Sequence, residues 1–310
     1  MPIQISALAI ILAITLGAAG VGAAEPASAR WHDDYLTAFE AARGKMLLVW
    51  FYDPSASSTN ERFESDVLGQ PPIAAAIEER HVAVKLPLTA AIASDSGPLT
   101  ILKHSAFVEL RGQPGLAIVD LTEPGGTLYG LVVSVYPFTR GPITAAKLAV
   151  LLDLPRGTLT QRTLICAVRT HAAQPASADS HLSPLLVRET ASHALHQANI
   201  ALQGHHHWQQ RFQAINAQLP AGLVAYEVCA ESWPGQDLIA AAEECVDSWR
   251  QSAGHWDLVS RRHVLFGYDM QRGSNGVWYA AGIFARYGTP SVAFHALRMR
   301  VPSPRAIRHG

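Results

Sequence analysis

The sequence predicts an α/β protein of two domains. Over the first half of the chain, short apolar runs alternate with segments whose apolar residues lie three or four apart. This is the pattern of strands alternating with helices. The second half has helical segments followed by two apolar runs around a turn-forming RGSN sequence, which indicates a hairpin. The length of 310 residues, of which 49% are hydrophobic and 16% charged, suffices for two cores.

Residues 1–24 have the outline of a signal peptide. An apolar run from Ile3 to Ala24 ends in small residues, as the region before a cleavage site does. No Lys or Arg precedes the run, and about 20 apolar residues can span a bilayer, so an uncleaved N-terminal anchor is the alternative. We therefore expect an exported protein, periplasmic or extracellular, that contacts a membrane only where this segment is retained.

The charge of the chain does not favour nucleic acid as a partner. The formal net charge is −1, which gives no bulk attraction to nucleic acid or acidic membranes. A C-terminal tail, residues 291–310, is locally basic, with no aromatic residue between its arginines Arg298, Arg300, Arg305 and Arg308. The sequence also lacks a Gly-rich phosphate loop and a Gly-x-Ser-x-Gly string, which disfavours nucleotide binding and ester hydrolysis.

The first domain, residues 31–153, is expected to begin with a helix over residues 35–42 and a buried strand over residues 46–52, MLLVWFY. The next helix follows in SSTNERFESDVL, where Ser57, Ser58 and Thr59 are expected caps rather than nucleophiles. Further elements follow the same patterns: helices over 73–79 and 143–154, and strands over 81–88, 112–121 and 126–135.

This order of elements resembles the thioredoxin fold over about residues 31–153. The matching residues are the strand MLLVWFY, the helix after DPSAS and the pair Gln113-Pro114 ahead of LAIVDL, where the resemblance implies a cis-proline at Pro114. Redox chemistry in that family needs a Cys-x-x-Cys at the helix start, and DPSASSTNERF contains no cysteine. The resemblance therefore implies a redox-inactive platform that binds a peptide strand or the second domain.

The second domain, residues 160–290, follows a joint of sequence LPRGTLTQ. Glycines are expected to end two of its helices and to present histidines. Gly204 precedes His205, His206, His207 and Trp208, and Gly254 is expected to make a left-handed turn that presents His255. The expected elements are helices over 164–171, 186–203 and 238–250, and strands over 264–270 and 276–286.

The chain contains three cysteines, Cys166, Cys229 and Cys245. An exported protein can keep disulfides, and a bridge between Cys229 and Cys245 would close a short loop with a stabilisation on the order of 3 kcal/mol. This pair is the candidate disulfide. Cys166 is then left over and is expected to be a small buried apolar residue.

Residues 160–290 resemble the CAP superfamily of cysteine-rich secretory proteins, antigen 5 and pathogenesis-related proteins (SCP-like), and especially its bacterial members. The string Trp249, Ser252, Gly254, His255, the helix with Glu189, Ala191 and Ala198 that leads to His205, and the strand GVWYAAGIF carry this resemblance. It implies an α-β-α sandwich. Trp208, Trp249 and Trp256 are expected in the core or as walls of its cleft.

In that superfamily, two histidines and one or two glutamates face a shared cleft and can hold a divalent metal. The resemblance matches His205 and His255 to the histidines and Glu231 to the first glutamate, with Glu227 as the competing choice. The usual GENxA string is absent, and Ser252 or a neighbour stands at the second glutamate position. Two imidazoles and a carboxylate suit Zn²⁺ and leave a position for water.

Three functions are compatible with these features. One is an exported binding protein that recognises an envelope or extracellular protein, lipid or glycan. Another is a metal-dependent, protease-like hydrolase with Glu227 as general base. The third is a purely structural envelope protein. The missing Cys-x-x-Cys and the incomplete set of glutamates favour the binding protein over catalysis.

Overall fold

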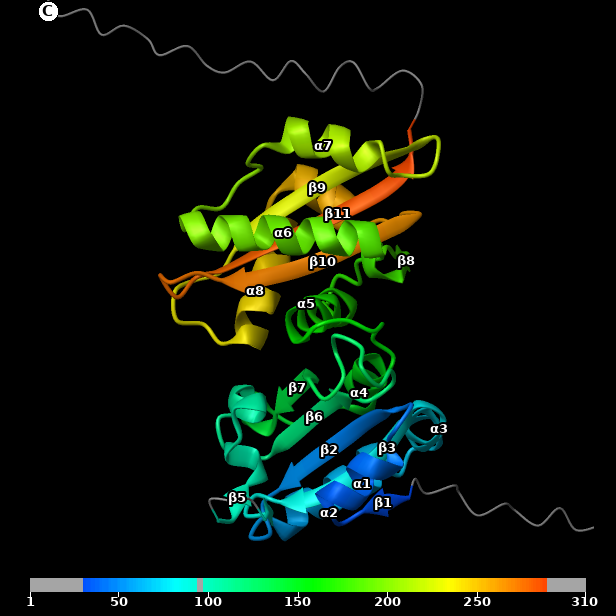
Figure 1. The fold of residues 1–310 in the computed structure, drawn as a ribbon, viewed down its shortest axis with the longest axis vertical. Coiled ribbons are helices and arrows are strands. Elements are labelled where there is room, and N and C mark those ends of the chain that lie inside the picture. The colour runs from blue at the N-terminus through cyan, green and yellow to red at the C-terminus, as the bar shows by residue number, and fades with distance from the viewer. Residues whose placement is uncertain (1–29, 94–96, 289–310) are drawn as a thin grey trace, which may run out of the picture.

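The computed structural model describes residues 30–93 and 97–288, whose two larger sheets lie one beyond the other along the long axis of the molecule (Figure 1). The expected leader, residues 1–24, and the basic tail, residues 291–310, lie outside the described residues. Across the described ranges, no helix combines the length and apolar character needed to cross a membrane. The protein is a mixed α/β structure, as its sequence predicts.

The first sheet has five strands in the order β1-β3-β2-β6-β7. Strands β1, β3 and β2 are parallel, and β6 and β7 continue the sheet in antiparallel register. Their bounds are Trp31–His32 for β1, Met46–Tyr52 for β2, His81–Pro87 for β3, Gly115–Asp120 for β6 and Val132–Pro137 for β7. A separate two-stranded ladder joins β4, Ala91–Ile92, to β5, Leu99–Thr100.

Helices cover both faces of this sheet, because alternate residues of its central strand point to opposite sides. In β2, Leu47 and Val49 pack on the side of α1, Tyr35–Ala41. Leu48 and Trp50 pack on the other side. That side holds three further helices, α2 at Ser57–Phe63, α3 at Pro71–Arg80 and α4 at Ala145–Leu152. The wholly apolar run MLLVWFY is therefore a strand buried on both faces.

Two details of the first half differ from the sequence prediction. The helix expected over 57–68 changes at Glu64 into a π-helical segment, Glu64–Leu68. The described residues contain no cis peptide bond, so the expected cis-proline at Pro114 is wrong. The chain reversal before β6 is made instead by Arg111 and Gly112, whose φ angles of 53° and 71° are left-handed.

The second sheet has four strands in the order β8-β10-β11-β9. The expected hairpin is present as β10, Leu265–Arg272, and β11, Trp278–Tyr287. Its outer neighbours are β8, His181–Leu182, and β9, Leu223–Glu231. Strand β9 was not predicted from the sequence. In the structure, its first four residues alternate between buried and half-buried positions.

Helices lie on both faces of the second sheet as well (Figure 1). One face packs against α6, Pro184–Ile200, and α7, Trp208–Asn216, through Leu186 and Ile215. The other face packs against three helices, α5 at Leu159–Thr170, α8 at Leu238–Gln251 and α9 at Ala253–Val259. Strand β9 is the sheet's outer strand on one side, so elements from both faces can meet at its edge.

Gly254 does not make the expected left-handed turn. Helix α8 ends at Gln251, and Ser252 adopts an extended conformation with φ −105° and ψ 113°. Helix α9 then begins at Ala253 and includes both Gly254 and His255. The extended serine, rather than the glycine, therefore separates the two helices and aims His255.

The expected disulfide is absent, because Cys166, Cys229 and Cys245 are all free thiols. Val228 and Ala230 of β9 pack in the same cluster as Cys245 of α8. Cys229 lies between them along the strand and so points to the opposite face of the sheet. The sheet therefore separates the two sulfur atoms.

The two sheets share one apolar core. A single cluster of buried residues includes Leu48 and Trp50 from the first sheet and Val228 and Phe266 from the second. The predicted division near residues 154–160 coincides with the joint between α4 and α5, and the assignment of two domains stays a prediction.

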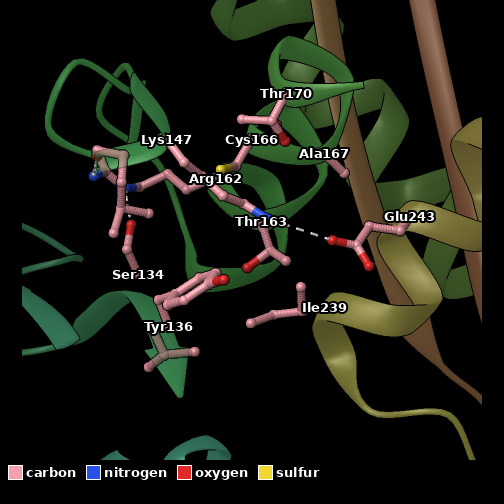
Figure 2. A pocket seen from close by; sticks show the side chains of 12 residues that line it. Ser134, Tyr136, Lys147, Arg162, Thr163, Cys166, Ala167, Thr170, Ile239 and Glu243 are labelled. Carbon is pink, nitrogen blue, oxygen red and sulfur yellow. Dashed lines mark hydrogen bonds and ion pairs between the residues drawn. The ribbon is translucent and has the colours of Figure 1, made fainter. Parts of the chain in front are cut away.

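Arg162 ties the joint together. The residue is 1% exposed. Its guanidinium donates to Ser134 Oγ of β7 at 2.7 Å, to the Leu154 carbonyl at 2.8 Å and to the Pro155 carbonyl at 2.9 Å. Figure 2 shows this side chain beside Cys166, at a small cavity that Tyr136 and Glu243 also line. Burial raises the pKa of the Cys166 thiol to about 11.

We expect opposite effects from alanine at two glycines. A Cβ at Gly267 of β10 would lie 2.4 Å from the Leu186 carbonyl carbon of α6 and 2.5 Å from Val187 N. Gly267→Ala should therefore lower the free energy of unfolding by about 3 kcal/mol. A Cβ at Gly254 meets nothing within 4 Å, and Gly254→Ala should stabilise α9 by about 0.5–1 kcal/mol. Urea unfolding measures both, and destabilisation by Gly254→Ala would contradict its helical placement.

His81 should make stability depend on pH. Burial lowers its pKa to about 4, so the unfolded chain takes up a proton below about pH 6.5 that the folded chain refuses. Stability is therefore lost as the pH falls. Between pH 7.5 and pH 5, the wild type should lose about 2 kcal/mol more unfolding free energy than His81→Gln. Equal slopes for the two proteins in urea unfolding would refute this assignment.

Candidate metal centre

The loop after α6 brings His205 to the edge of the second sheet. The helix ends at Ile200, and the next residue, Ala201, caps it with a left-handed φ of 51°. The loop then folds back over the last turns of α6. His193 Nε2 donates to the Gly204 carbonyl at 2.9 Å, and Gly204 N donates to Gln197 Oε1 at 3.0 Å. These two hydrogen bonds hold Gly204 against α6 and so fix the position from which the chain continues into His205, His206 and His207.

Glu227 of β9 is the buried charge at the centre of the site. Its side chain is 1% exposed. His205 Nδ1 lies 3.0 Å from Oε1, His193 Nε2 lies 3.8 Å from the same oxygen, and Arg211 of α7 donates to Oε2. Burial alone would raise the pKa of Glu227, but the hydrogen bonds from His205 and Arg211 outweigh it and hold the pKa below its usual value. The carboxylate is therefore charged and fully engaged.

Arg211 is itself held in place by an aromatic ring. Its guanidinium carbon lies 5.4 Å from the centre of the Trp208 ring, within the range of a cation–π contact. Trp208 also packs on Phe212 at 5.7 Å. Trp208 thus positions the arginine that neutralises Glu227.

His205 and His255 face each other through their Nε2 atoms. These atoms are 3.3 Å apart, and the ring centres are 5.5 Å apart. The contact with Glu227 selects the His205 tautomer that carries its proton on Nδ1, which leaves the Nε2 lone pair directed at His255. Burial lowers the pKa of His255, as does the neighbouring His205, so its ring is neutral at pH 7.

This pair fits a transition-metal ion. Zinc binds imidazole nitrogen at about 2.0–2.1 Å, so two nitrogens on one tetrahedral zinc lie about 3.3 Å apart. The Nε2 atoms of His205 and His255 have this spacing. Glu227 lies on the other side of the His205 ring, at Nδ1. It therefore orients a ligand and is not itself placed as one.

The predicted site residues are brought together in part. His205 and His255 meet as expected, and Glu227, the competing choice, lies beside them. Glu231 is exposed at the end of β9, where it pairs with Tyr279 of β11, and no contact joins it to either histidine in the described structure.

The tryptophans expected as cleft walls have different roles. Trp249 is fully buried in the core and stacks on Tyr268 at 5.6 Å, so it lines no cleft. Trp256 lies 5.6 Å from the ring of His171 and packs against the same core. Of the three, Trp208 supports the site, through Arg211.

A second, deeper group lies behind His205. Ligand atoms of His193, Glu227 and Cys229 all lie within 4.8 Å of one another, and the Cys229 sulfur is 3.7 Å from His205 Nδ1. Burial, together with the charge of Glu227, raises the pKa of the Cys229 thiol well above its usual value. A cation there would have to displace Arg211 from Glu227 and a proton from the thiol, so the outer histidine pair is the better metal site.

Sequence reasoning missed His193 and Arg211, and it assigned Cys229 to a disulfide and not to this site. His193 is buried on α6, and no sequence motif marked it. If LVAYEVCAE had been predicted as a strand, Glu227 and Cys229 would have been placed on the same face, because alternate residues of a strand point to one side. Arg211 had no local signal, because its partner is 16 residues away in the sequence.

Comparisons with known proteins assign no family to the chain. No family model matches it, and no curated protein does. Among solved structures, an outer surface protein of Borrelia burgdorferi shows a similarity with 13% identity and a TM-score of 0.29, over 35% of this chain and 78% of that one.

Removing the charge of Glu227 should destabilise the protein. The Glu227 side chain is 1% exposed and pairs with Arg211. Glu227→Gln would leave this arginine without a carboxylate partner, and the free energy of unfolding should fall by on the order of 3 kcal/mol. Glu231→Gln, on the same strand but exposed, is the matched control and should change stability by less than about 0.5 kcal/mol. Urea unfolding of both variants decides, and equal effects would show that Glu227 does not hold the site together.

Proposed function

We propose that this chain is an exported binding protein whose second half holds a first-row divalent metal, in the first place Zn²⁺, between His205 and His255. The observation that carries the proposal is the 3.3 Å separation of the two Nε2 atoms. The buried Glu227 contacts Nδ1 of His205 and so orients the His205 ring. Neutral imidazole is a ligand that zinc and its neighbours accept, whereas Mg²⁺ and Ca²⁺ prefer oxygen.

The chain's residues divide the work of such a site. His205 and His255 hold the ion, Glu227 fixes the tautomer and direction of His205, and Arg211 keeps Glu227 in place. Two protein ligands leave coordination positions open, and a bound ion supplies a Lewis acid that can accept a donor from another molecule. A carboxylate, phosphate or imidazole of an envelope protein, lipid or glycan is the class of group that would fill them.

The geometry favours binding over hydrolysis. A metal-dependent hydrolase needs a base beside the metal-bound water. Glu227, the candidate base, lies at Nδ1 of His205, on the far side of the ring from Nε2. Its lowered pKa and its ion pair with Arg211 also make it a poor proton acceptor. Glu227 is therefore better assigned as a positioning residue.

We also propose that the two halves are a thioredoxin-like and a CAP-like unit. Helices on both faces of a mixed five-stranded sheet support the first assignment. Helix α2 begins at Ser57 without a cysteine in its first turn, so this half would act as a platform and not as an oxidoreductase. The four-stranded sheet between two helical layers, with His205 and His255 at one edge, supports the second.

Metal binding can be tested on the full-length protein, purified without a histidine tag. Calorimetric titration with Zn²⁺ should give a binding event that His205→Ala and His255→Ala each weaken by at least about 100-fold, since even residues that only orient a ligand are worth 10–100-fold. His181→Ala removes an exposed imidazole of β8 and should leave this event unchanged. If both site variants fold and bind Zn²⁺ as the wild type does, the site is refuted.

A further inference from the structure

Five histidines gather at the end of α6: His193, His196, His205, His206 and His207. Three of them, His196, His206 and His207, lie outside the site described above. Ring centres of His196 and His206 are 5.5 Å apart, and those of His196 and His207 are 5.7 Å apart. We propose that His196, His206 and His207 form a second site for a first-row transition-metal ion, independent of the His205 and His255 pair.

His196 supplies the fixed ligand of this site. It lies on α6, and its Nε2 atom is buried without a hydrogen-bond partner in the described structure. An unpaired buried polar atom costs about 1–3 kcal/mol, and buried side-chain nitrogens are normally satisfied. A metal ion bound to Nε2 removes this deficit. The imidazole ring is otherwise packed against His193, with ring centres 6.2 Å apart and planes inclined by 18°.

His206 and His207 approach His196 from the loop. Their rings meet the His196 ring at 67° and 63°, so neither lies flat on it. His206 Nε2 donates to the Leu202 carbonyl at 3.2 Å, which leaves the Nδ1 lone pair of the neutral ring free to bind an ion. The ligand nitrogens of the three rings do not all lie within 4.8 Å of one another in the described residues. His207 has a left-handed φ of 55° at the start of α7, and its exposed ring must rotate to close the site.

His193 lies between the two proposed metal sites and is a ligand in neither. Its Nε2 proton is committed to the Gly204 carbonyl at 2.9 Å. Burial lowers the pKa of His193 to about 4, so the ring stays neutral between the two groups. The consecutive residues His205 and His206 therefore point in different directions from one loop. His205 contacts Glu227 and His255, whereas His206 contacts His196.

The ligand chemistry selects the ion. Three neutral imidazoles without a carboxylate favour Cu²⁺, Ni²⁺ and Zn²⁺ and disfavour Mg²⁺ and Ca²⁺. The affinity for Cu²⁺ is expected to exceed that for Zn²⁺, in line with the general order for divalent ions. The second site should thus add one equivalent of transition metal to the one held by His205 and His255.

The test counts metal equivalents in the full-length, tag-free protein by Zn²⁺ titration and native mass spectrometry. The wild type should bind two ions. The double variant His206→Ala/His207→Ala should lose one of them and retain the other with unchanged affinity, and His205→Ala/His255→Ala should do the reverse. His181→Ala should keep both, and Ca²⁺ should produce no binding.

A measurement without substitutions covers the case in which a variant fails to fold. Diethyl pyrocarbonate modifies free imidazoles, so Zn²⁺ should reduce modification of His206 and His207 at least tenfold, as read by peptide mass spectrometry. A second equivalent that survives in folded His206→Ala/His207→Ala, or modification of these two histidines that is the same with and without Zn²⁺, would overturn the second site. If the wild type binds one Zn²⁺ ion, and His206→Ala/His207→Ala abolishes this binding while His205→Ala/His255→Ala does not, the proposed function is refuted and the second site is supported.

Discussion

The carboxylate of Glu227 is the constraint around which the second half is organised. A charge on the face of a sheet, with a side chain 1% exposed, costs several kcal/mol unless it is paired and hydrogen-bonded. Two hydrogen-bonding groups meet that requirement: His205 from the loop after α6, and Arg211 from α7. The ending of α6 and the direction of the loop follow from bringing these two groups to the carboxylate oxygens of Glu227.

The position of β9 explains why the imidazoles of His205 and His255 can meet. His205 comes from a loop on the α6 face of the sheet, and His255 comes from α9 on the other face. An inner strand would keep such residues about a sheet thickness apart. Because β9 is an outer strand, the two side chains reach each other around its edge, where solvent and a ligand also have access.

Sequence patterns predicted the elements better than the contacts. The apolar run MLLVWFY and the two runs around RGSN predicted β2, β10 and β11, because burial on a sheet directly restricts residue type. The pairing of His205 with His255 rested on a family resemblance, and the structure brings the two together. The choice between Glu227 and Glu231 could not be made, because it depends on which strand residues face α6 and where the strand ends.

Other errors have the same origin in three-dimensional placement. Cys229 and Cys245 are close in sequence, but a strand and a helix place them on opposite faces of the sheet. Gly254 is a residue that favours a left-handed turn, yet the extended Ser252 had already broken the helix. At Pro114 a cis bond was expected, but the peptide bond is trans, and the left-handed residues nearby are Arg111 and Gly112. In each case the outcome depends on how the backbone places neighbouring residues or elements, which the sequence does not reveal.

The shared core has a consequence for motion. One apolar cluster runs from Leu48 in the first sheet to Phe266 in the second, and Arg162 is hydrogen-bonded to Ser134 and to the Leu154 carbonyl at the joint. Opening the joint would therefore expose apolar surface to water and break the hydrogen bonds of a buried guanidinium. Such a joint resists hinge bending. We therefore expect the two halves to move as one rigid body. A molecule that binds either half would then also fix the orientation of the other half.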